Sequence, residues 1–249
     1  MRSTIAGQTF TSEFWESPLG SHSSPTVALG VEALETRNLL SKATLAVAMG
    51  ILKSPEEFQH FIISDYKHLL GRAPDQSGLS HFVADMELGA TRETIEADLA
   101  SSKEYRLLHG NTATGFITGL YQDLLGRLPN AVELNVWLTD LANGASVFSV
   151  AKAIGTSPER DVAIIQDDYA LFLGRSPRLD EVVFWLNQFQ AGADRTNVAA
   201  AIIASDEFFA EAANDPSTYI THVYQDLFLR TPAQTEINFW LNVYNQNKP

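Results

Sequence analysis

The sequence predicts an all-α protein, built from four tandem three-helix units that are arranged as two duplicated helical modules. Three observations support this fold class. A block with the pattern Tyr-x-x-x-x-x-Arg-x-Pro occurs four times, the apolar residues after each block recur with the period of a helix, and turn residues separate the periodic stretches. Regular spacing at four places is a specific sign of tandem duplication.

The repeated positions are an arginine, a tyrosine six residues before it and a large aromatic residue ten residues after it. Twelve residues occupy these positions: Arg72, Arg127, Arg175, Arg230, Tyr66, Tyr121, Tyr169, Tyr224, Phe82, Trp137, Trp185 and Trp240. A serine followed by x-Glu stands thirty residues after the first three arginines, at Ser102, Ser157 and Ser205.

Each unit is expected to hold three helices, which gives about twelve in the chain. The first helix precedes the arginine. The second follows it, because apolar residues fall 7, 10, 11 and 14 positions after the arginine, as at Leu134, Trp137, Leu138 and Leu141. The third follows a glycine and starts at Thr91, Ser146 or Asp194, whose side chains can cap a first turn.

Helix ends are marked by recognisable residues. Ser54-Pro55-Glu56 and Ser157-Pro158-Glu159 each combine an N-cap, a proline at the first helical position and an acid in the first turn. Gly71, Gly126 and Gly174 are typical helix stops. Leu229 replaces the glycine in the fourth unit, so we expect that turn to close with a different geometry.

The arginines are 55, 48 and 55 residues apart, so a two-unit module of 103 residues has itself been duplicated. The longer spacings come from seven extra residues around 110–115 and 213–218. Residues 42–53 match the third helix of a unit whose first part is missing. The predicted domains are therefore a poorly ordered leader at 1–41, a first module at 42–144 and a second at 145–249.

Composition limits the possible functions. The 249-residue chain has a net charge of −13, which disfavours binding to nucleic acid. It has no cysteine, so disulfides, thiolate zinc sites and cysteine nucleophiles are excluded. The longest charge-free apolar stretch, residues 43–52, is about half of the roughly 20 residues that a membrane span needs.

The repeated arginines are expected to clamp the turns between helices, since a guanidinium group has five donors for carbonyls and carboxylates. Candidate partners are Glu133, Glu181, Glu236, Asp123 and Asp226. The alternative, an anion site, would need the arginines to converge, which a linear array opposes. Arg230 should matter less than the others, because its unit lacks the glycine and one neighbour.

The tryptophans are expected in the core, because they lie within the helical stripe, although exposed rings could also stack on sugars. Asp75-Gln76-Ser77-Gly78 resembles part of a calcium loop but lacks its alternating acids. The six histidines show no metal-ligand spacing, and we find no nucleophile elbow or phosphate-binding loop. The sequence therefore predicts no catalytic, cofactor or metal residues, while a triad assembled in space stays open.

The Tyr-x-x-Leu-Leu-Gly-Arg-x-Pro block, the later tryptophan and glycine, and the Ser-x-Glu motif resemble the bacterial domain-of-unknown-function family 4214 (DUF4214) over about residues 42–249. The pattern is more distantly similar to the phycobilisome linker domain, which organises other proteins. Residues 31–41, VEALETRNLLS, resemble an N-terminal motif of exported bacterial proteins. In exported proteins this motif precedes an apolar stretch, which here is residues 43–52, and the repeat makes the same residues a packed helix. The two interpretations compete, but both hold if the leader is not cleaved.

These resemblances imply a non-enzymatic interaction or scaffold module of an exported or cell-surface protein. Its partner is expected to be a protein or a cell-surface component, with no cofactor, nucleic acid or membrane span. The alternative is a carbohydrate-binding surface protein. Two or more exposed, coplanar aromatic rings would favour carbohydrate, and an apolar helix face with a polar rim would favour protein.

Overall fold

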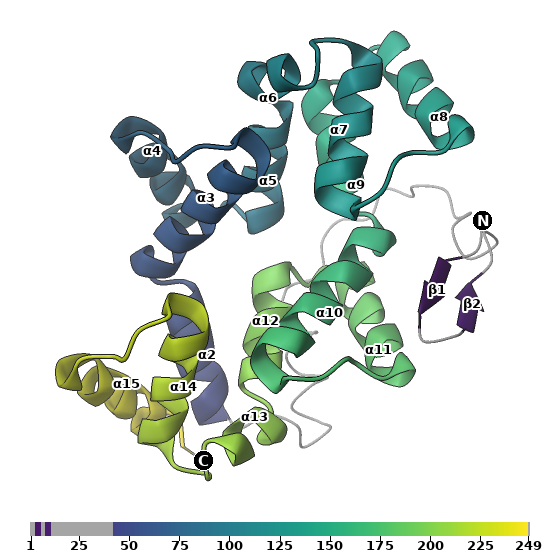
Figure 1. Cartoon of the computed structure of the whole chain (residues 1–249). Helices are drawn as coiled ribbons and strands as arrows, with labels where there is room; N and C mark the ends of the chain where they lie inside the picture. The colour runs from purple at the N-terminus through teal and green to yellow at the C-terminus, as the bar shows by residue number, and fades with distance from the viewer. Residues whose placement is uncertain (1–2, 6–7, 11–41, 249) are drawn as a thin grey trace.

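The computed structural model describes residues 3–5, 8–10 and 42–248. The first two of these segments are short strands, β1 (Ser3–Ile5) and β2 (Gln8–Phe10), which pair antiparallel. The rest of the predicted leader lies outside the described residues. From residue 42 onward the chain is helical, so the predicted all-α fold class is confirmed (Figure 1).

The helices follow one another with short connections. In chain order they are α2 (Lys42–Leu52), α3 (Pro55–Leu70), α4 (Gln76–Glu87), α5 (Arg92–Ser101), α6 (Lys103–Leu108), α7 (Ala113–Leu125), α8 (Ala131–Ala142), α9 (Val147–Gly155), α10 (Pro158–Leu173), α11 (Leu179–Gln190), α12 (Arg195–Ile203), α13 (Asp206–Glu211), α14 (Pro216–Phe228) and α15 (Gln234–Gln246).

The first helix of a unit is continuous in α3 and α10 and broken in the other two units. There the extra residues divide it into α6 and α7, and into α13 and α14. Gly110 and Asn111 at the first break, and Ala213 and Asn214 at the second, have positive φ angles that a helix cannot continue through. These two breaks add two helices to the expected twelve.

The capping residues act as the sequence predicts. The Ser54 side chain accepts a hydrogen bond from the Glu57 amide, and Gly71, Gly126 and Gly174 end their helices in the left-handed conformation. Leu229 adopts the same conformation, with φ of 54°. The expectation of a different turn in the fourth unit is therefore wrong, because its leucine accepts the backbone geometry that glycine has elsewhere.

Two separate apolar cores divide the helices into two modules. The N-terminal module contains α3–α9, and the C-terminal module contains α10–α15 together with α2. This division differs from the predicted boundaries at 42–144 and 145–249, because α2 belongs to the second core and α9 to the first. The reason is that third helices pack in pairs, α5 with α9 and α12 with α2.

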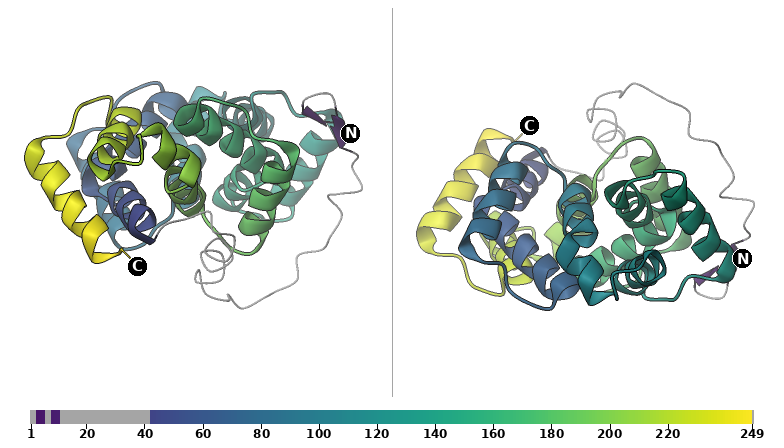
Figure 2. Two further views of the ribbon diagram at one scale, coloured as in Figure 1. Left: turned by 90° about the horizontal axis from the view of Figure 1, so that it is seen from below. Right: turned by 90° about the horizontal axis from the view of Figure 1, so that it is seen from above.

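Helix α2 completes the fourth unit from the opposite end of the chain. It lies against α12 and α15, and the two views from below and above show the same neighbourhood (Figure 2). An added Cβ on Gly50 would lie 2.5 Å from the Trp240 ring, so this close approach requires glycine. Residues 42–53, which match the third helix of an incomplete unit, therefore supply the third helix of the fourth unit. The array of four units is closed on itself rather than linear.

Candidate functional site

Each repeated arginine forms a clamp at the end of the first helix of its unit. Arg127 donates to both carboxylate oxygens of Glu133, at 2.9 and 2.8 Å, and to both oxygens of Glu159, at 2.5 and 2.6 Å. Arg175 binds Glu181 and Glu207 in the same way, and Arg230 binds Glu236 and Glu56. Both edges of the guanidinium plane are therefore occupied by carboxylates.

Each clamp arginine lies over the ring of the repeated tyrosine of its unit. The arginine carbon Cζ lies 5.2, 5.0, 4.9 and 4.8 Å from the ring centres of Tyr66, Tyr121, Tyr169 and Tyr224. Three of these tyrosine hydroxyls accept a hydrogen bond from a tryptophan Nε1, of Trp137, Trp185 and Trp240 respectively. The structure thus brings the predicted arginine, tyrosine and tryptophan together in units two to four.

The first unit departs from this pattern. Phe82 packs edge-on against Tyr66 but has no N–H to donate, and Gly78 stands where the other units have the nearer glutamate. A Cβ on Gly78 would lie 2.7 Å from the Tyr66 hydroxyl, so the ring fills part of the missing side chain's space. Arg72 keeps a single glutamate partner, Glu104, at 2.5 and 2.6 Å.

The nearer glutamates, Glu133, Glu181 and Glu236, were among the predicted partners, whereas the farther ones were not. Glu104, Glu159 and Glu207 each stand 32 residues after their arginine, within the repeated Ser-x-Glu motif. This constant spacing of 32 residues could have identified them as partners from the sequence. Glu56 also follows such a serine, yet it precedes Arg230 by 174 residues, so only the closed array explains the pairing.

The farther glutamates define two kinds of clamp. Arg72 to Glu104 and Arg175 to Glu207 each stay within one module, whereas Arg127 to Glu159 and Arg230 to Glu56 join the two modules. The hydrogen bond from arginine lowers the pKa of Glu104 and Glu207, and lowers that of Glu236 to about 2. These three carboxylates are therefore ionised at neutral pH.

The two aspartates predicted as partners of the arginines, Asp123 and Asp226, are not among the clamp residues. Asp123 accepts a hydrogen bond from the Tyr105 hydroxyl at 2.7 Å and lies 3.3 Å from His109 Nε2, so its assignment to Arg127 is wrong. Burial raises the pKa of Asp226, which the nearby His222 partly offsets. Asp75 caps α4 by accepting from the Gly78 amide, as an ordinary N-cap does.

Aromatic side chains in the helical part are mostly covered. Trp185 and Trp240 are buried and Trp137 is partly buried, in agreement with the predicted core position. Within residues 42–248, Phe239 is the single aromatic residue that is exposed.

Within the described residues, no group of three or more histidine, aspartate or glutamate side chains could hold a metal ion. None of the helices in residues 42–248 combines the length and the apolar content that a membrane span requires.

The fold and the clamps together define a class: an all-α tandem-repeat protein whose units each carry an arginine held over a tyrosine and bound to glutamate. A family model described as "Domain of unknown function (DUF4214)" matches the chain four times, at residues 57–109, 98–164, 161–212 and 199–248. The chain therefore belongs to the DUF4214 family, as the sequence resemblance predicted. No curated protein and no solved structure matches it.

Proposed function

We propose that this protein is a non-catalytic interaction module that acts as a scaffold by binding another protein. The observation that carries the proposal is a set of solvent-facing apolar side chains on two second helices. Val132 and Val136 on α8 are 73% and 49% exposed, and Leu179 and Val183 on α11 are 42% and 43% exposed.

Within each helix, the spacing of these residues places them on one side. Val132 and Val136 are four residues apart, which places them on one side of α8, and the exposed Leu128 precedes that helix. Polar, exposed Asn135 and Thr139 lie beside them on the same helix. An apolar stripe with a polar rim is the surface that a protein partner fits.

Carbohydrate binding is the weaker alternative, because a sugar platform needs at least two exposed rings and Phe239 stands alone in residues 42–248. The non-catalytic part of the proposal is supported by the clamps, in which the repeated charged groups already bind one another. Placement outside the cell is supported by the resemblance of residues 31–41, which lie outside the described residues.

The binding proposal is tested by affinity capture from the envelope fraction, with three tagged baits. The parent should retain a protein that the V132D/V136D variant loses, while S80D/A84D, which adds the same two charges at exposed positions of α4, should keep it. Circular dichroism should match for all three baits. Equal capture by all three baits, or capture by none, would contradict the proposed face.

The export proposal is tested separately, by fractionating cells that carry a tagged full-length chain. Recovery in the envelope or medium supports it, and recovery only in the cytoplasm contradicts it.

A further inference from the structure

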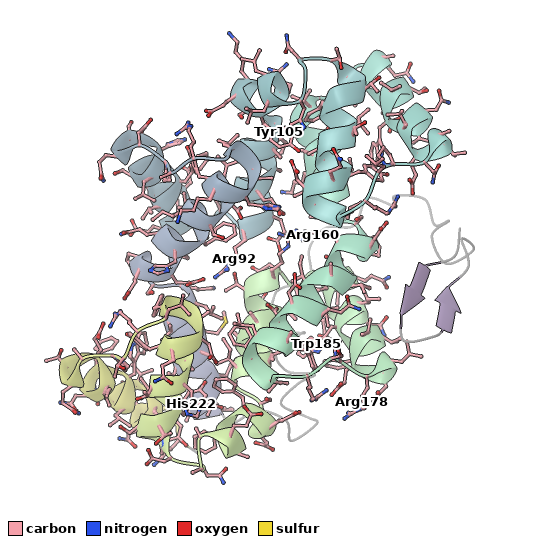
Figure 3. The ribbon with its side chains drawn as sticks, in the orientation of Figure 1. Arg92, Tyr105, Arg160, Arg178, Trp185 and His222 are labelled. Atoms are coloured by element: carbon pink, nitrogen blue, oxygen red, sulfur yellow. The ribbon has the colours of Figure 1, made fainter. Side chains whose placement is uncertain are left out.

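The boundary between the two modules is built from charged rather than apolar residues. The two apolar cores are separate, and between them α5 faces α12 while α9 leads into α10. Figure 3 shows Arg92 and Arg160 in the middle of the molecule, where the two modules face each other. We name the charged residues that meet there the central cluster.

The central cluster contains ion pairs across the boundary. Arg195 of α12 donates to Glu96 of α5 at 2.6 Å and to the Gly155 carbonyl, and its backbone amide donates to Glu93 at 2.8 Å. Arg160 of α10 donates to the other oxygen of Glu96 at 2.9 Å. Glu96 is only 3% exposed, so these bonds are shielded from water.

The duplication explains why these pairs cross between modules. Residues 103 apart are equivalent, so Arg92 corresponds to Arg195 and Glu57 corresponds to Arg160. Arg92 binds Glu57 inside the N-terminal module, at 2.5 Å. In the C-terminal module the position that corresponds to Glu57 is occupied by Arg160, which cannot accept a hydrogen bond from Arg195. Arg195 therefore binds Glu93 and Glu96 of the N-terminal module.

Acidic groups outnumber basic ones in the central cluster. Its basic members are three arginines, which bind three glutamates: Arg92, Arg160 and Arg195 with Glu57, Glu93 and Glu96. Three aspartates come in addition, Asp65 from α3 and Asp161 and Asp168 from α10. The Asp65 Oδ2 atom is buried without a hydrogen-bond partner. Around them lie four further charged or titratable groups, His60, Asp167, Asp194 and Lys53.

We propose that the boundary between the modules is a proton-sensitive joint, closed while the extra aspartates are protonated and loosened when they ionise. Asp65 belongs to the N-terminal module, and Asp161 and Asp168 belong to the C-terminal module. Ionisation therefore places negative charge on both sides of a buried boundary, where the charges repel each other and lack water.

The direction of the pH effect follows from the pKa values. Burial raises the pKa of Asp65 well above its usual range and raises the pKa of Asp161 and Asp168 to about 7. A carboxyl with a higher pKa in the closed form binds its proton more tightly there. Closure is therefore strongest below the unperturbed pKa of 3.8, weakens as the pH rises from 3.8 to about 7 and is weakest above that range.

The test measures the distance between the modules in the full chain. Because the chain has no cysteine, S80C on α4 and N187C on α11 can be labelled selectively, and these helices lie at opposite corners of the molecule (Figure 1). Pulsed electron spin resonance should show one narrow distance distribution at pH 5.5. A second population, at a different distance, should increase at least about tenfold between pH 5.5 and pH 8.5, because opening of the joint is linked to the release of one or more protons.

Substitution identifies the groups responsible. In the D65N/D168N variant the second population should grow much less with pH, because only Asp161 of the three aspartates can still ionise, whereas D140N on α8 should respond like the parent. If the double variant does not fold, D65N and D168N alone should each reduce the pH response. A parent distribution that is identical at both pH values, or an unchanged response in the folded aspartate variants, would overturn the proposal.

Discussion

At the scale of single residues, Arg127 shows why arginine recurs at this position. Its planar group binds one glutamate on each edge while its face covers Tyr121. Lysine would keep the positive charge but could not bind two carboxylates bidentately or lie flat on the ring. The clamp side chains are about one third exposed, so solvent reduces the energy of each contact.

Arg127→Lys, Arg175→Lys and Arg230→Lys should each lower the free energy of unfolding by about 1 to 2 kcal/mol, measured by urea titration. Arg72→Lys should cost less, because Arg72 has one glutamate partner and is 43% exposed. This order replaces the expectation that Arg230 matters least, since Arg230 binds both Glu56 and Glu236.

Arg178→Lys provides the control for this series, because Arg178 is 67% exposed, lies outside the repeated position and reaches the clamp residue Glu181 through one nitrogen at 3.1 Å, a contact that lysine can keep. It should leave stability unchanged. If all the lysine variants unfolded with the parent, the clamps would contribute nothing to stability, and the arginines would need another role.

At the scale of helices and turns, most of the structure could be predicted. The apolar period, the serine N-caps and the glycine stops located the helices, because these signals are local. The central cluster could not be found in this way. Arg92 and Arg195 stand at the first position of their helices, where a charged residue is ordinarily exposed, and only packing between modules buries Arg195.

The turn at Leu229 supplies a prediction at this scale. Leu229 has a left-handed backbone and is 90% exposed, so its side chain contributes strain and few contacts. Leu229→Gly should therefore raise the free energy of unfolding by about 0.5 to 1 kcal/mol in a denaturant titration. Leu171→Gly, at an exposed site inside α10, should lower it by a similar amount, because glycine weakens a helix interior.

Loss of stability in both glycine variants would show that the Leu229 turn is not strained. The two substitutions remove the same side chain from exposed positions, so their difference in sign isolates the backbone conformation.

At the scale of the whole molecule, the two ends of the helical part of the chain meet and close the array of four units. Helix α2 supplies the third helix of the fourth unit, and Glu56 just after it supplies the second glutamate for Arg230. The family matches begin at residue 57, so α2 lies outside them. The spacing in the sequence indicates that residues 42–53 resemble a third helix. It could not predict that this helix packs against the opposite end of the chain, because that contact joins distant segments.

The contact between Gly50 and Trp240 tests this closure most directly. These residues are 190 positions apart, yet the Trp240 ring lies directly over the Gly50 backbone. In isotope-labelled protein we predict nuclear Overhauser cross-peaks between the Gly50 Hα protons and the Trp240 ring, together with ring-current shifts of those Hα signals. A folded chain that shows no cross-peak between residues 42–52 and 234–246 would contradict the closed array.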